Sequence, residues 1–68
     1  MKLIEVLELL STNKKCKVYH DCIAMDDKLT FKGTIKDLLK QSYLCYNGTL
    51  FQIIADDFEH HIAFILEN

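Results

Sequence analysis

The sequence predicts a small α+β domain, in the order α-β-β-α-β-β, with two helices on one face of an antiparallel four-stranded sheet. Two segments place apolar residues at helical spacing, and two pairs of strand-like segments flank acidic turns. The chain has 68 residues, no proline and two glycines, so it contains no linker and forms one domain, residues 1–68. A core of this size supplies only about 3–5 kcal/mol unless a metal, disulfides or association add to it.

The first helix is predicted over residues 3–11. Apolar residues recur there at helical spacing, while Lys2, Glu5 and Glu8 fall on the opposite side. The polar run of residues 11–13 ends the helix. The segment is therefore amphipathic, and one of its faces packs on a core.

A first hairpin is predicted from residues 16–24 and 29–33, which turn about Asp26 and Asp27. This fold places Cys22 opposite Phe31 on one face and Asp21 opposite Lys32 on the other. The predicted core face holds Val18, Cys22, Ala24, Leu29 and Phe31.

The second helix is predicted from Thr34, whose hydroxyl caps the N-terminus, with Asp37 in a position that imitates a capping box. Its apolar stripe continues to Tyr46. The Asn47-Gly48 pair has two interpretations: a left-handed helix terminator or the turn of a hairpin. The length of the stripe favours the terminator.

A second hairpin is predicted from residues 49–55 and 60–66, with Ile53 opposite Ile62. Both faces of this hairpin are largely apolar, although a sheet with one wet face should alternate between apolar and polar residues. Since the two helices cover only one face, a second copy is expected to cover the other, as a homodimer. The predicted self-association residues are Leu50, Ile54, Ala63 and Ile65.

The charge and the cysteines limit the class of protein. Eight lysines against ten acidic residues give a formal net charge of -2, which argues against nucleic-acid binding through bulk charge. No apolar run approaches the roughly 20 residues that span a bilayer. Three cysteines without a CxxC pair favour a reducing compartment, so a cytoplasmic location is expected.

The sequence predicts no metal and no cofactor. Cys16, His20 and Cys22 share one face of a strand, but His20 and Cys22 would lie about 6–7 Å apart along it, which is awkward for one zinc ion. The cysteines are therefore interpreted as small apolar core residues with free thiols.

Two pairs of acidic residues, Asp26-Asp27 and Asp56-Asp57, suggest an alternative hypothesis, a small metal-dependent enzyme that uses Asp and His groups. Both pairs fall at predicted hairpin tips, where aspartate is common because it bonds its own backbone. Catalysis also needs a pocket with converging groups, which so small a chain seldom forms alone. The prediction is a protein that is not an enzyme.

Two stretches carry a resemblance to known proteins: residues 17–21, which read KVYHD, and residues 31–39, which read FKGTIKDLL. The chain resembles small proteins of phages and mobile elements of Gram-positive bacteria. The similarity spans nearly the whole chain at the level of pattern, and His20 interrupts the V-Y-D match. The resemblance implies a context and no shared activity: small phage proteins of this kind are often inhibitors or decoys aimed at host machinery. The function expected in that context is an interaction protein in the host cytoplasm, an inhibitor that binds a host defence or regulatory protein.

The second hairpin tip is the predicted contact with such a host target. It consists of Asp56, Asp57, Phe58 and Glu59. A phenylalanine between acidic residues has no evident cover in a monomer, and the acidic side chains would steer the tip towards a basic surface. A further alternative is an oligomeric decoy for a small nucleotide signal. The chain has neither arginine nor a glycine-rich phosphate loop, which argues against that function.

Overall fold

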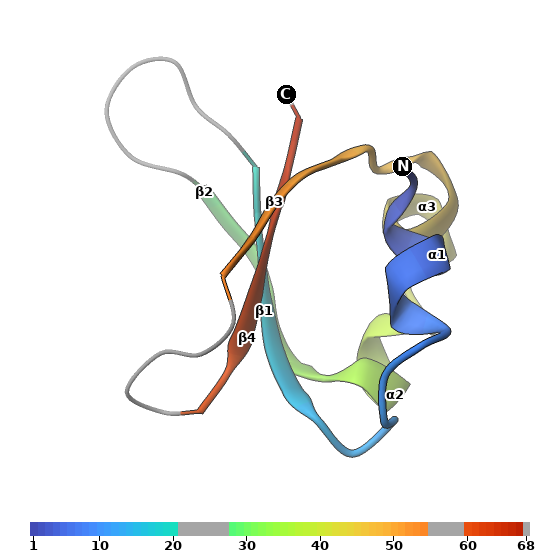
Figure 1. Ribbon diagram of the computed structural model, residues 1–68, viewed down its shortest axis with the longest axis vertical. Coiled ribbons are helices and arrows are strands. Elements are labelled where there is room, and N and C mark those ends of the chain that lie inside the picture. The colour runs from blue at the N-terminus through green and yellow to red at the C-terminus, as the bar shows by residue number, and fades with distance from the viewer. Residues whose placement is uncertain (21–27, 55–59, 68) are drawn as a thin grey trace.

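In the computed structural model, which describes residues 1–20, 28–54 and 60–67, short helices lie on one side of a sheet (Figure 1). This arrangement confirms the α+β class and the placement of the helices on one face. The order is α-β-β-α-α-β-β. The helices are α1 (Leu3–Leu7), α2 (Ile35–Leu38) and α3 (Ser42–Asn47), and the strands are β1 (Lys15–His20), β2 (Lys28–Thr34), β3 (Leu50–Ile54) and β4 (Ile62–Leu66).

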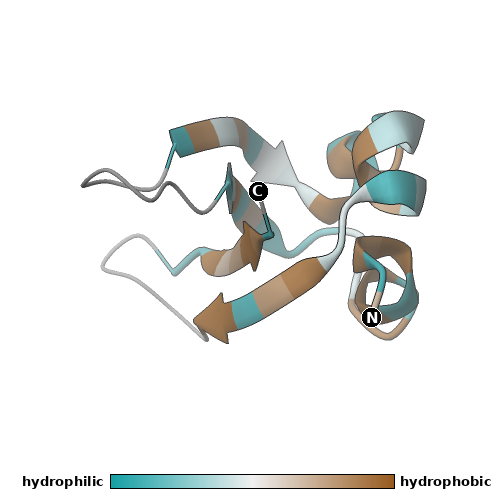
Figure 2. Ribbon diagram, turned by 90° about the horizontal axis from the view of Figure 1, so that it is seen from above, coloured by the Kyte–Doolittle hydropathy of each residue, from teal (hydrophilic) through white to brown (hydrophobic). Residues whose placement is uncertain are grey.

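The sheet is mixed, so the prediction of an antiparallel sheet was wrong. Its strand order is β2-β1-β4-β3. Each hairpin is antiparallel as expected, but the inner strands β1 and β4 run parallel, with Val18 opposite Phe64. Helices α2 and α3 connect the two outer strands, β2 and β3, which leaves those strands at opposite edges of the sheet (Figure 2).

Strand β4 occupies the centre because all five of its residues are apolar. Phe64 and Leu66 face the helices and are fully buried, while Ala63 and Ile65 on the other face keep only 7% and 6% exposure. A strand covered on both faces reads as a continuous apolar run, not as an alternating one. The apolar residues on the outer face of the predicted sheet are therefore partly accounted for by burial within a single chain.

The register of the second hairpin differs from the prediction by two residues. Ile53 lies opposite Phe64 instead of Ile62, and Ile54 lies opposite Ala63. A shift of two preserves the face of each side chain, because strand side chains alternate with period two. Leu50 is the exception: a bulge between Leu50 and Gln52 turns it to the helix side.

The register of the first hairpin differs by four residues. Phe31 lies opposite Val18, and Lys32 lies opposite Lys17 instead of Asp21. The predicted partner of Phe31, Cys22, lies outside the described residues, as do Asp21 and Ala24.

A bulge in the first hairpin moves Leu29 out of its predicted core position. Because the register changes between Val18 and Tyr19, Leu29 lies opposite Tyr19 and is 47% exposed. The extra residue, Thr30, donates its hydroxyl to the Val18 carbonyl oxygen at 3.1 Å. The hydroxyl thus satisfies the Val18 carbonyl oxygen at the bulge, where the regular hydrogen bonding between β1 and β2 is interrupted.

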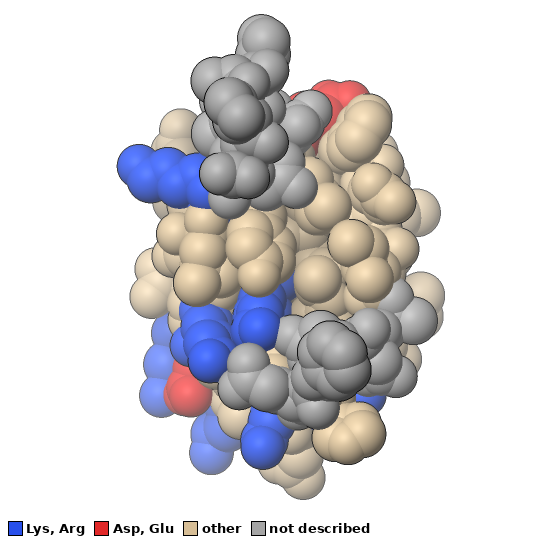
Figure 3. Space-filling view, turned by 90° about the vertical axis from the view of Figure 1, so that its left-hand side faces the viewer, with Lys and Arg blue, Asp and Glu red and all other residues tan. Residues whose placement is uncertain are grey.

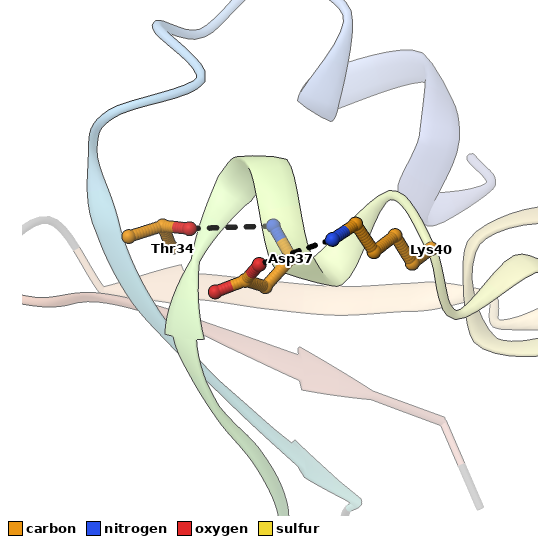
Figure 4. A network of polar contacts seen from close by, with 3 residues as sticks. All are labelled: Thr34, Asp37 and Lys40. Atoms are coloured by element: carbon orange, nitrogen blue, oxygen red, sulfur yellow. Dashed lines mark hydrogen bonds and ion pairs between the residues drawn. The ribbon is translucent and has the colours of Figure 1, made fainter.

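The first two helices are short and capped. Helix α1 ends at Leu7, four residues before the predicted end, and the Lys2 N–H donates to Glu5 Oε2 at 2.6 Å. At α2 the predicted cap is confirmed, since Thr34 Oγ1 accepts the Asp37 N–H at 3.2 Å (Figure 4). Asp37 Oδ1 also lies 3.8 Å from Lys40 Nζ.

The single second helix of the prediction is broken into α2 and α3. The Leu38 carbonyl oxygen, at the end of α2, accepts the Gln41 N–H at 2.8 Å. It also accepts the Cys45 thiol of α3 at 3.2 Å, so hydrogen bonds link the two helices across the break. Gly48 ends α3 by donating its N–H to the Leu44 carbonyl oxygen at 2.9 Å. Its φ of -67° and ψ of 124° are extended. The predicted end of the helix at Asn47-Gly48 is therefore confirmed, but the left-handed geometry and the alternative of a hairpin turn were wrong.

The core lies between the helices and the sheet and draws on every helix and on the two central strands. Among the described residues, those buried to at least 99% are Leu3, Leu7, Cys16, Val18, Ile35, Leu38, Cys45, Phe64 and Leu66. Cys16 and Cys45 behave as the sequence predicted, as small core residues.

Gly48→Ala is expected to destabilise the protein because a Cβ at this position would lie 2.5 Å from the Leu44 carbonyl oxygen and 2.8 Å from Leu66 Cδ1. We expect a loss of about 1–3 kcal/mol in the free energy of unfolding, measured with urea. Gly33→Ala is the matched control, since its Cβ would meet side-chain atoms first, the Phe31 ring at 3.1 Å and Asp37 Oδ2 at 3.9 Å, and no backbone atom closer than these. Equal losses in the two variants would contradict the close packing at Gly48.

Candidate functional site

The two edges of the sheet differ in charge. Strand β2, at one edge, carries Lys28 and Lys32, whereas the sequence of β3, at the other edge, is LFQII and carries no charge. Edge strands present unpaired backbone N–H and C=O groups, and proteins commonly guard them with lysine. The β2 edge is guarded in this way and the β3 edge is not.

Strand β3 also exposes large apolar side chains. Phe51 is 58% exposed, Ile53 42% and Ile54 44%. Gln52 is the one polar residue of β3, and Figure 2 shows a strand that is apolar along most of its length. Single exposed apolar residues are ordinary, but a cluster of them on an unguarded edge makes that edge a candidate site of association. We call these three side chains, with the outer edge of β3, the β3 edge.

The N-terminal segment covers the start of the β3 edge. The Leu50 N–H donates to the Met1 carbonyl oxygen at 2.8 Å, and the Leu3 N–H donates to the Gly48 carbonyl oxygen at 2.9 Å. Lys2 and Thr49 form an isolated antiparallel bridge. The edge that remains open to another strand therefore begins after Leu50.

The predicted self-association residues do not all share one surface. Ile54 lies opposite Ala63 on the face away from the helices, and Ile65 lies on that face opposite Gln52. Ala63 and Ile65, however, are already buried in one chain, and Leu50 packs against the core. Placing Leu50 on the outer face was wrong because the bulge was not foreseen. Of the four, only Ile54 belongs to the β3 edge.

The predicted association residues did not include Phe51 and Ile53, because the alternation of strand side chains puts these two on the face opposite Leu50 and Ile54. Ile53 does lie on the same face of the sheet as Phe64. It is not fully covered there, because 42% of its surface stays exposed. The available signal was the uncharged sequence of the strand compared with the lysines of β2. That signal becomes informative only when both strands are known to be edges.

The outer face of the sheet is partly basic. Lysines gather on one half of this face (Figure 3), where Lys17 and Lys32 lie opposite each other. The described residues contain all eight lysines but only four acidic residues. The other six acidic residues fall in segments 21–27 and 55–59, so acidic and basic residues are distributed unevenly along the chain.

The predicted target contacts Asp56, Asp57, Phe58 and Glu59 lie outside the described residues.

A shallow groove lies where the parallel strands β1 and β4 end. Its volume is about 380 Å³, and it is lined by His20, Tyr43, Leu44, Asn47, Gly48, Thr49 and Glu67. Lys2 lies beside it and donates to the Asn47 carbonyl oxygen at 3.3 Å and to Thr49 Oγ1 at 3.2 Å.

The groove does not suit an anionic nucleotide. Phosphate sites use arginine forks or clustered backbone N–H groups, whereas this lining includes the carboxylate of Glu67, which repels phosphate. The nearby Lys2 ammonium already bonds two groups of the groove wall. This groove is therefore poorly suited to hold a nucleotide.

The buried thiols of Cys16 and Cys45 hold their protons at neutral pH, which disfavours nucleophilic attack by either sulfur. Burial raises the pKa of Cys16 to about 11, with a smaller contribution from Cys45, and burial also raises the pKa of Cys45. The thiolate is the form that attacks and that binds metals. Within residues 1–20, 28–54 and 60–67, no three His, Cys, Asp or Glu side chains gather as a metal site would require.

Comparisons with known proteins add no function. No protein-family model, curated protein or solved structure matches the chain. No helix in the described part of the chain has the length and apolar character needed to cross a membrane.

The raised pKa of Cys16 predicts a loss of stability in alkaline solution. The folded state holds the thiol proton up to a pH of about 11, while the unfolded chain releases it near the ordinary value of 9.0. The stabilisation is complete below pH 9 and is lost as the pH rises towards 11, by about 2–3 kcal/mol.

Denaturant unfolding of the wild type and of Cys16→Ala across this range measures the difference. The variant should be less stable at neutral pH, because it leaves a cavity, but its stability should fall less steeply above pH 9. Parallel curves for the two proteins would contradict the assignment of this pH dependence to Cys16.

Proposed function

We propose that the chain is a non-enzymatic interaction protein that forms a homodimer through the β3 edge. The observation that carries this proposal is the contrast between the edges: β3 exposes Phe51, Ile53 and Ile54 without any charge, while β2 carries lysines. Pairing of edge strands is a common mode of protein association, because the backbone supplies hydrogen bonds and side chains supply specificity.

The size of the domain supports association. Domains of this length bury a smaller fraction of their surface than larger ones do, so many depend on oligomerisation, metals or disulfides. Cys16 and Cys45 form no disulfide. A second copy at the β3 edge would add buried apolar surface that one chain cannot supply.

The exposed side chains provide a useful but limited driving force. Complete burial of an isoleucine or phenylalanine side chain contributes about 1.5–3 kcal/mol, and these three are half covered already, so each copy gains about 3 kcal/mol. Two copies gain about 6 kcal/mol. Association costs about 4–15 kcal/mol, so this gain offsets only the lower part of that range. The dimer is therefore expected to depend on each of these side chains and on the hydrogen bonds of the paired strands.

The dimer would act by binding a target. From the resemblance we propose an inhibitor of a host defence or regulatory protein, with Asp56, Asp57, Phe58 and Glu59 as the contact. This segment follows β3 by one residue in the sequence, so the β3 edge and the target contact would be neighbours along the chain. The supporting feature is the acidic segment, which complements a basic target surface.

Ile53→Lys is expected to convert the homodimer into a monomer, because it places like charges at the junction of two edges. Sedimentation equilibrium should give twice the chain mass for the wild type at high micromolar concentration and the mass of one chain for the variant. Leu39→Lys is the matched control, since Leu39 is 37% exposed but lies at the end of α2.

Circular dichroism should show that both lysine variants remain folded, because both side chains are already partly in solvent. The control should sediment as the wild type does. A wild type that stays monomeric at high micromolar concentration would refute the homodimer.

A further inference from the structure

Among the described residues, the part of the β3 edge left open to a second strand runs from Gln52 to Ile54. Leu50 is engaged by Met1 at the outer edge, and the bulge between Leu50 and Gln52 interrupts the ladder with β4. From Gln52 to Ile54 the ladder is regular. A second strand can therefore pair with residues Gln52, Ile53 and Ile54 without displacing the N-terminal segment.

Symmetry restricts how two such edges meet. Residues directly opposite each other in an antiparallel pair point to the same face. A two-fold axis normal to the sheet keeps each side chain on the same face in both copies. Paired residues must then be separated by an even number of positions in the sequence, so one residue lies opposite its own copy, on the axis. Within the open stretch that residue is Gln52, Ile53 or Ile54.

Two of these positions fit poorly. An axis at Gln52 would place Ile54 opposite Leu50 of the second copy, whose N–H already donates to Met1. Among the residues of β3, Leu50–Ile54, an axis at Ile54 aligns Ile54 alone with a β3 residue of the second copy. An axis at Ile53 aligns three residues of each strand and leaves both N-terminal segments in place.

We propose that the two copies pair antiparallel along β3, with Ile53 opposite Ile53 of the second copy on a two-fold axis, so that one sheet of eight strands runs through the dimer. This inference rests on the proposed homodimer and specifies its register. Both Ile53 side chains lie on the helix side, as Phe64 does, and Ile54 meets Gln52 of the second copy on the outer face.

The composition of β3 suits pairing with itself. Like charges directly opposite each other destabilise a strand pair, and β3 has none. Pairing of β2 with β2 of another copy would instead bring lysines together along the junction. The second copy is therefore the occupant that the β3 edge accepts without a charge conflict.

Disulfide trapping tests the register. Residues directly opposite in an antiparallel pair have Cα atoms about 4.5–5.5 Å apart, within the range of about 4.4–6.8 Å found for disulfides. Ile53→Cys, oxidised in air with copper phenanthroline, should migrate mostly as a covalent dimer on a non-reducing gel. The wild type under the same conditions measures the background from its native thiols, of which Cys16 and Cys45 are buried.

The neighbouring positions provide the matched controls. Gln52→Cys or Ile54→Cys alone should cross-link much less, because each residue is diagonal to its own copy at about 7–8 Å. A mixture of these two variants should cross-link readily, since Gln52 of one copy is opposite Ile54 of the other. On the unmodified protein, a half-labelled NMR sample should show contacts between the Ile53 methyl groups of the two copies.

The outcomes separate the register from the proposed function. A dimer by sedimentation whose strongest single-site cross-link is at Gln52 or Ile54 overturns the register and leaves the homodimer intact. A dimer that cross-links at none of the three positions overturns the β3 pairing. A monomer by sedimentation overturns the homodimer and the register together.

Discussion

The parallel contact between β1 and β4 joins two hairpins that would be marginally stable alone. An isolated two-stranded hairpin buries too little surface to be stable in water, whereas a sheet of three or more strands with an apolar face can be. Val18 of β1 lies opposite Phe64 of β4, and both side chains are fully buried beneath the helices. The helix layer, the buried cysteines and the identity of the edge strands all depend on this junction.

One consequence of the junction is the position of β3. Once β1 and β4 are central, β2 and β3 must be edges. The lysines of β2 are then placed where they discourage association, while β3 presents Phe51, Ile53 and Ile54. The same residues in a central strand would be ordinary core, so their functional meaning comes from the strand order.

A second consequence is that the N-terminus takes part in the edge. Helix α1 packs on the core through Leu3 and Leu7, which brings Met1 and Lys2 beside the start of β3. This contact occupies the first backbone groups of the strand and shortens the stretch open to a partner. It also connects α1, the wall of the groove and the β3 edge, because Lys2 bonds both Asn47 and Thr49.

Local features of the sequence determined the elements, and the tertiary structure decided how they pair. Helical spacing, the Thr34 cap and the acidic turns identify the helices and the hairpins, because these signals act over a few residues. The two-residue shift at Ile53 left the face assignments largely correct, since side chains repeat every two residues. The bulges beside Leu50 and Leu29 could not be foreseen. The parallel β1–β4 contact and the exposure of β3 were likewise decided by packing between distant segments, because a strand has the same local pattern whichever neighbour it acquires.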